Sequence, residues 1–190
     1  ILDTVRKTRA ASLDELTENL AVNANIQLEQ GITTCEVKSG YGLTTDDEIK
    51  MLEAVQNVDQ THAIDLVGTC LAAHTPPPEF GDSPSYLQYI SESILPRVKE
   101  LNLSQRVDIF IEEGAFLPDE SISFLMKAKN MGFSLVIHAD QFKRGGSQIA
   151  CELGALSADH LEESRSEEIV DLAEAGVIAT VLPGASMGLG

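Results

Sequence analysis

The sequence predicts an α/β protein whose fold is an incomplete (β/α)8 TIM-type barrel of about six βα units, lacking the first and last strands. Short apolar runs rich in β-branched residues alternate with stretches of helical periodicity. The runs recur about every 30 residues, which is the size of one βα unit. In addition, three of the four histidines stand at the carboxyl ends of such runs. In a parallel barrel these ends meet at one rim, where barrel enzymes carry their active sites.

The apolar runs are expected to form parallel strands joined by right-handed crossovers. They span residues 32–37, 65–73, 107–111, 135–138, 155–160 and 177–182. The chain of 190 residues has no low-complexity segment and no evident linker, so we expect one domain over 1–190. An open, doubly wound sheet fits the same periodicity. The glycine fingerprint of dinucleotide-binding sheets and the Walker phosphate loop are both missing, which favours the barrel.

Helix boundaries are predicted from capping residues. Ser12 with Glu15, and Thr45 with Glu48, have the spacing of a capping box at a helix start. A third helix is expected over 84–101, after a proline-rich loop.

The later helices follow from similar signals. Pro118 opens a helix whose buried stripe is expected to contain Ile122, Leu125 and Met126. A short helix leads to Gly154, and Ser164 with Glu167 suggests a capping box for the last one.

Composition and charge restrict the partners. The formal net charge of −17 argues against nucleic-acid and membrane-surface partners, because both are anionic. No apolar stretch approaches the roughly 20 residues that span a bilayer, and the first residues lack a secretory h-region, so a cytoplasmic location is expected. The cysteines, Cys35, Cys70 and Cys151, are widely spaced and are not expected to form a disulfide or a zinc-thiolate site.

The histidines are the strongest functional signal. His74, His138 and His160 each follow a predicted strand, whereas His62 lies in a loop and is expected to be structural. One histidine at a strand end is usually a hydrogen-bonded core residue. Three at equivalent strand ends instead indicate a metal or acid/base site.

Other polar residues lie beside these strand ends. Asp140 is expected either to orient a loop amide or to accept a hydrogen bond from a neighbouring ligand. Glu112 and Glu113 are rim carboxylates or solvated, ion-paired groups. Tyr41 stands between two glycines, which let the backbone turn sharply, and Lys38 is a charge beside a buried strand.

Taken together, these segments resemble imidazolonepropionase, a family of the amidohydrolase superfamily. The most specific part is Glu-Val-Lys-Ser-Gly-Tyr-Gly at 36–42. Further matching segments follow in order along essentially the whole chain, at 33–43, 72–74, 76–80, 137–141, 157–161 and 182–184. By this resemblance the chain is the central part of a metal-dependent amidohydrolase barrel domain.

The resemblance implies hydrolysis of 4-imidazolone-5-propanoate to N-formimidoyl-L-glutamate, a step of histidine degradation, with one zinc or iron ion. His138 would be a metal ligand and His160 the catalytic electrostatic or acid/base group. Tyr41, His74 and Gln141 would bind the small-molecule substrate. Gln141 stands where some relatives carry Glu, and an amide cannot serve as a base.

The chain also departs from the family pattern. The family's metal site uses a His-x-His pair on the first strand and an Asp on the last, and the chain has no His-x-His anywhere. We therefore expect the isolated 190 residues to be inactive and to bind metal weakly. Two alternatives remain open: another heterocycle amidohydrolase or deaminase, or a non-catalytic truncated assembly module. Because an unclosed barrel exposes strand edges, a homo-oligomer such as a dimer is expected.

Overall fold

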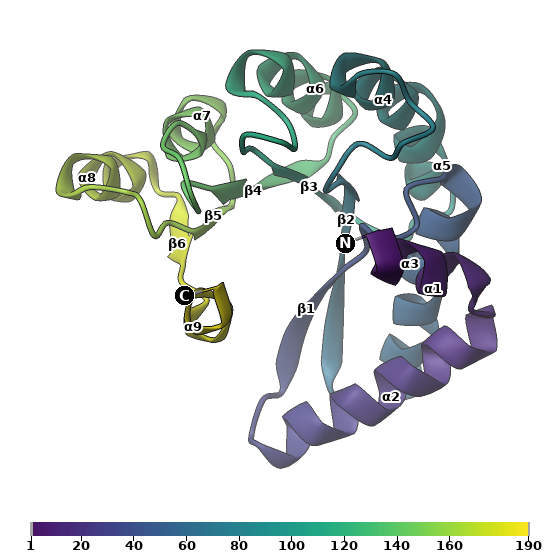
Figure 1. Cartoon of the computed structure of the whole chain (residues 1–190). Coiled ribbons are helices and arrows are strands. Elements are labelled where there is room, and N and C mark those ends of the chain that lie inside the picture. Colours follow the sequence, from purple (N-terminus) through teal and green to yellow (C-terminus); the bar gives the residue numbers. More distant parts are fainter. Residues whose placement is uncertain (1, 190) are drawn as a thin grey trace. The chain divides into compact units, whose positions relative to one another are not determined.

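The computed structural model describes residues 2–189, which divide into two compact units. Unit 1 contains the residues up to 72 together with 92–105, and unit 2 contains 73–91 and the residues from 106 onward. In this part of the chain six parallel strands alternate with helices (Figure 1). The predicted fold class, a partial TIM-type barrel, is confirmed.

Unit 1 is built on two parallel strands covered by helices. Its elements are α1 (Leu2–Ala10), α2 (Leu13–Glu29), β1 (Thr34–Lys38), α3 (Thr45–Asp59), β2 (Asp65–Ala73) and α5 (Leu95–Glu100). The register of β1 and β2 runs from Thr34 opposite Asp65 to Lys38 opposite Thr69. Helices α2 and α3 pack against each other. One core cluster joins Ala24 of α2, Val55 and Val58 of α3, and Ile64 and Leu66 at β2.

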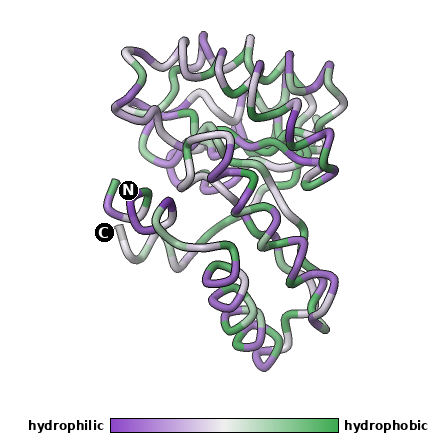
Figure 2. Tube along the Cα trace, turned by 90° about the vertical axis from the view of Figure 1, so that its right-hand side faces the viewer, coloured by the Kyte–Doolittle hydropathy of each residue, from purple (hydrophilic) through white to green (hydrophobic). Residues whose placement is uncertain are grey.

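Unit 2 repeats the βα pattern. Its elements are α4 (Ser83–Tyr89), β3 (Arg106–Phe110), α6 (Pro118–Asn130), β4 (Ser134–Ala139), α7 (Gly146–Leu153), β5 (Ser157–His160), α8 (Ser166–Ala175), β6 (Ile178–Thr180) and α9 (Pro183–Leu189). Each of β3, β4 and β5 pairs in parallel with the next strand along the chain. Helices α6, α7 and α8 follow one another along the outside of these strands (Figure 1). These helices bury apolar residues such as Leu125 of α6, Ile149 of α7 and Leu172 of α8. Figure 2 shows hydropathy changing within single helical turns.

The predicted strands agree closely with the observed ones, with β2 matching over its full length. The last run is shorter than expected, because β6 covers three residues and α9 starts at Pro183. Two apolar residues of that run, Ile178 and Val181, are 66% and 67% exposed. Ile178 is paired with Ser157 of β5, whereas Val181 lies beyond the paired residues, so hydrophobicity alone predicted a longer strand than the sheet contains.

Several helix predictions were wrong at their starts. The N-cap of α3 is Thr44 rather than Thr45, and Glu48 lies one residue deeper and is fully buried. The N-terminal helix α1 was missed, although Asp3 pairs with Lys7 at the i,i+4 spacing that supports helices.

The start of α8 also differs from the prediction. Glu168 accepts a hydrogen bond from the Arg165 N–H at 2.8 Å, so the box is not formed by Ser164 and Glu167. The Ser164 hydroxyl instead donates to Asp140, which withdraws it from the helix start.

Two helix interiors also differ from expectation. The helix predicted over 84–101 contains a π-helical turn at Ile90–Ile94, just before Pro96, which has no N–H to donate to the preceding turn. The boundary between the two units falls inside this turn. In α6, Met126 is 51% exposed and Phe124 takes its place on the buried face.

No helix within residues 2–189 combines the length and apolar character needed to cross a bilayer. The three cysteines are free thiols.

The capping box of α2 gives a pH-dependent prediction. Glu15 accepts a hydrogen bond from the Ser12 N–H at 2.8 Å, and this bond is the main reason why the pKa of Glu15 lies below its ordinary value. A lowered pKa means that the stabilisation is present above the pKa of the unfolded chain and is lost as the pH falls through the folded-state pKa. Urea unfolding should show Glu15→Ala less stable than the parent at pH 7, with a smaller difference at pH 3. An equal difference in stability at both pH values would show that the charge of Glu15 does not contribute to the capping box.

Candidate active site

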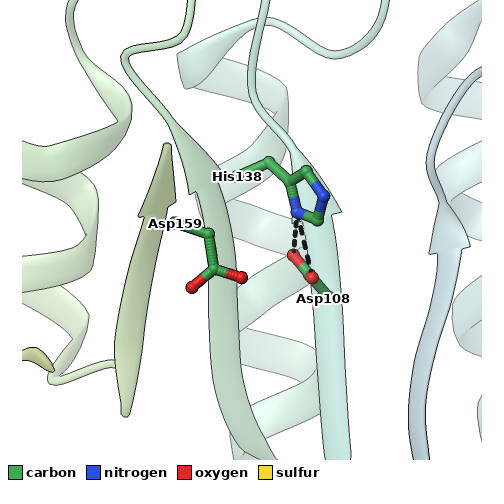
Figure 3. Close-up of side chains that lie close together, drawn as sticks. All are labelled: Asp108, His138 and Asp159. Atoms are coloured by element: carbon green, nitrogen blue, oxygen red, sulfur yellow. Dashed lines mark hydrogen bonds and ion pairs between the residues drawn. The ribbon is translucent and has the colours of Figure 1, made fainter. Parts of the chain in front are cut away.

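The carboxyl end of β4 carries His138, which is held by a buried aspartate. His138 Nδ1 lies 3.0 Å from each carboxylate oxygen of Asp108, whose side chain is 0% exposed on β3 (Figure 3). Register explains the contact: His138 lies opposite Phe110, and Asp108 shares a face with Phe110 because it is two residues earlier in the strand. Beside an ionised Asp108, which can only accept hydrogen bonds, Nδ1 would carry the proton and Nε2 the lone pair.

Asp159 completes a cluster on the other side of His138. It lies opposite His138 in the register of β4 and β5. Asp108, His138 and Asp159 each offer a ligand atom, and these atoms lie within 4.8 Å of one another. The second ring nitrogen of His138 points away from both carboxylates (Figure 3). The cluster therefore presents one oriented imidazole between two buried carboxylates.

His160, the last residue of β5, also faces His138. Their ring centroids are 5.1 Å apart. Neighbouring strand residues normally point to opposite faces, but His160 has φ of 83°, which ends the alternation and lets Asp159 and His160 approach the same neighbour. A non-glycine residue in this region is strained, and such strain is concentrated at functional sites.

The surroundings of His160 favour a neutral ring. Burial lowers the pKa of His160 below its ordinary value, and His138 lowers it further, while Glu162 acts in the opposite direction. The Nδ1 atom of His160 is buried and makes no hydrogen bond within residues 2–189; Glu162 Oε1 lies 3.7 Å away. A neutral imidazole can accept a proton from a bound molecule at a ring nitrogen that the molecule reaches.

His74 is the third histidine of this group. It follows β2, and its ring centroid lies 6.1 Å from that of His138 and 6.2 Å from that of Phe110. The structure thus brings together the three histidines that the sequence assigned to strand ends. His62 lies elsewhere: its ring is bonded to Asn25 and to the Ile64 N–H, which is a structural role.

Gln141 lies on a loop held by two buried carboxylates. We call residues 140–146 the Gln141 loop. Asp140 accepts hydrogen bonds from the N–H groups of Gly145 at 2.9 Å and Ser147 at 3.2 Å, and from two serine hydroxyls. Glu112 accepts from the N–H groups of Phe142 and Lys143. Of the two roles considered for Asp140, the structure thus supports the orientation of loop amides.

Tyr41 belongs to unit 1, on a loop at residues 40–43 that we call the Tyr41 loop. Its side chain is half-buried. Lys38, at the end of β1, forms an ion pair with Glu36 at 3.2 Å.

A cavity of about 620 Å³ lies beside the Gln141 loop in unit 2. Its lining includes Pro76, Ile111, Leu117 and two basic residues of the Gln141 loop, Lys143 and Arg144. Both basic side chains are paired with glutamates, Glu113 and Glu168. The three histidines are absent from its described lining, so this cavity is separate from the histidine cluster.

The sequence analysis missed Asp108 and Asp159 as site residues. A signal existed for Asp108, because it interrupts the apolar run Val107–Ile111 with a charge. A charge inside a buried strand requires a partner, and that partner is the His138 ring.

Curated proteins match the chain over essentially its whole length. An imidazolonepropionase of Streptococcus gordonii strain Challis is 49% identical over the whole chain. The chain is thus similar to imidazolonepropionases over its whole length. Those of Bacillus velezensis and Bdellovibrio bacteriovorus are 45% and 44% identical over 100% and 98% of the chain. The chain covers 44–45% of each of these three relatives, which is about half of their length. No protein-family model matches the chain.

Solved structures show the same fold at low sequence identity. Adenine deaminase from Arthrobacter aurescens aligns with a TM-score of 0.69 and 12% identity, over 98% of this chain and 57% of its own. A Xaa-Pro dipeptidase with bound methionine in the active site aligns with a TM-score of 0.55 and 16% identity, over 82% of this chain and 43% of its own.

Proposed function

We propose that the complete gene product hydrolyses 4-imidazolone-5-propanoate to N-formimidoyl-L-glutamate, and that this chain supplies the strand ends that face the substrate. The observation that carries the proposal is the 44–49% identity to imidazolonepropionases over essentially the whole chain. In the reaction, water adds its oxygen to the ring carbonyl carbon, the carbon–nitrogen bond breaks, and the released nitrogen takes a proton.

One zinc or iron ion fits the side chains around His138. The contact with Asp108 leaves the Nε2 lone pair for a metal, an arrangement typical of metal-binding histidines. When bound, the ion lowers the pKa of a coordinated water and polarises a carbonyl. We infer that the isolated 190 residues bind it weakly, since they contain no His-x-His pair.

The remaining residues would act on the substrate. His160, neutral at neutral pH, would accept a proton from the attacking water and return one to the leaving nitrogen. His74 and the Tyr41 hydroxyl would hold the substrate by hydrogen bonds. Gln141 would do so through its amide, which donates and accepts hydrogen bonds without gaining or losing a proton.

Turnover by the complete gene product tests the proposal. Ring opening of imidazolonepropionate would be followed with and without a chelator, and adenine would be offered as a second substrate because an adenine deaminase shares the fold. The expected result is chelator-sensitive opening of the imidazolone and no release of ammonia from adenine. Absent or chelator-insensitive turnover of the imidazolone would refute the assignment.

Asp108→Asn is expected to weaken metal binding about 10- to 100-fold, because carboxylates that orient ligand histidines have effects of this size. The metal affinity of the complete gene product would be measured by competition with a chromogenic chelator. Asp119→Asn, an exposed acid at the start of α6, is the matched control and should leave the affinity unchanged. Equal affinities for Asp108→Asn and the control would rule out the orienting role.

A further inference from the structure

The backbone of the Tyr41 loop converges on one side chain. The Gly40 N–H donates to Glu48 Oε2 at 3.0 Å, and the N–H groups of Gly42 and Leu43 donate to Oε1 at 2.9 and 2.8 Å. Glu48 lies in the first turn of α3 and is 0% exposed. A single buried carboxylate therefore accepts hydrogen bonds from three backbone N–H groups on the two sides of Tyr41.

Steric contacts fix the same loop. Gly40 has φ of 109°, and a Cβ there would lie 2.6 Å from the Leu71 carbonyl oxygen. A Cβ on Gly42 would lie 2.6 Å from the Asp47 carbonyl carbon. Leu43 has φ of 58° and a fully buried side chain. The loop thus packs too tightly against β2 and the start of α3 to accept side chains at either glycine.

The outer side of the loop has its own contact. Arg9 of α1 donates from Nε to the Gly42 carbonyl at 2.7 Å. Lys50 Nζ donates one hydrogen bond to the Arg9 carbonyl at 3.1 Å and another to Asp47 at 2.8 Å. Charged groups therefore hold the backbone next to Tyr41 through both its N–H and its C=O groups.

The buried position of Glu48 has an energetic cost. Burial raises the pKa of this carboxyl above its ordinary value, and hydrogen bonds from Ser39 and the Tyr41 loop offset the effect in part. Only a carboxylate offers two acceptor oxygens to these donors. In a glutamine an NH2 group would replace one of these two oxygens and would face N–H donors instead of accepting from them.

We propose that Glu48 is a positioning residue, which fixes the Tyr41 loop so that the Tyr41 hydroxyl meets the substrate. This inference rests on the proposed function, in which Tyr41 binds the imidazolone substrate. Glu48 itself does not touch the substrate, so its effect passes through Tyr41.

A double-mutant cycle separates this role from plain stabilisation. KM and kcat for imidazolonepropionate would be measured in the complete gene product for Glu48→Gln, Tyr41→Phe and the double variant. Each single variant is expected to raise KM about 10-fold, the effect of one hydrogen bond to a charged or well-oriented group. The double variant should then be no worse than Tyr41→Phe alone. Multiplied KM effects, or a normal KM for either single variant, would overturn the proposal.

Amide hydrogen exchange in this chain provides a readout that needs no activity. Exchange at Gly40, Gly42 and Leu43 should accelerate at least about 10-fold in Glu48→Gln, and Asp46→Asn, an exposed acid on the same helix, is the control. Unchanged exchange would overturn the anchoring role. Glu48→Asp replaces Glu48→Gln if the latter does not fold, because it keeps the charge with a shorter reach. If the parent protein does not turn over the imidazolone but exchange is faster in Glu48→Gln, the proposed function is refuted and the anchoring of the Tyr41 loop by Glu48 stands.

Discussion

Replacing His138 by alanine is expected to reduce the metal content of the complete gene product to background and to abolish ring opening. His138 is the imidazole that Asp108 orients at the end of β4, with its second nitrogen turned away from both neighbouring carboxylates. The neighbouring carboxylates cannot take over metal binding from His138, because they do not offer a neutral imidazole nitrogen that is held in one tautomer. Metal content would be measured by elemental analysis after dialysis, and turnover on the same samples.

His62→Ala is the matched control for this experiment. His62 bonds to Asn25 and the Ile64 N–H, outside the histidine cluster, so its loss should leave metal content and turnover unchanged. Full metal retention by His138→Ala would show that His138 is not a ligand.

His160→Gln is expected to lower kcat about 10²- to 10⁴-fold, the usual contribution of a general acid/base, while the metal content stays at the parent level. Burial and His138 keep the ring neutral, and its Nδ1 makes no hydrogen bond within the described part of the chain. The fold should therefore tolerate the substitution, because no protein hydrogen bond of that nitrogen is lost. Stopped assays and elemental analysis on one preparation would separate the two effects.

A loss of metal in His160→Gln would instead make His160 a ligand. A kcat within about two-fold of the parent would remove it from the acid/base role, since such a change is far below the expected range.

Most strands could be predicted from the sequence, because a buried parallel strand leaves a continuous apolar run. Helix starts were less accurate, since several residues near them can serve as caps. Ser164 is such a residue, and in the structure its hydroxyl bonds to the distant Asp140. The missed helix α1 has little apolar surface, with Val5 and Thr8 as its buried residues.

The three strand-end histidines were found because strand ends of a barrel share one rim. Asp159 could not be found with them, since strand alternation assigns opposite faces to Asp159 and His160. The positive φ of His160 brings both toward His138, and no local sequence pattern encodes that angle. Glu48 was taken for a capping residue, because only the folded loop shows that its carboxylate accepts three backbone N–H groups.

The anchoring of the Gln141 loop has a consequence for changes in specificity. Asp140 and Glu112 hold this loop by backbone N–H groups and by serine hydroxyls, while the Gln141 side chain takes no part in those bonds. The residue at 141 can therefore be exchanged for an acid or a smaller amide without rebuilding the loop. On the proposed role of Gln141 in substrate binding, substitutions at position 141 are expected to change substrate preference with little effect on stability.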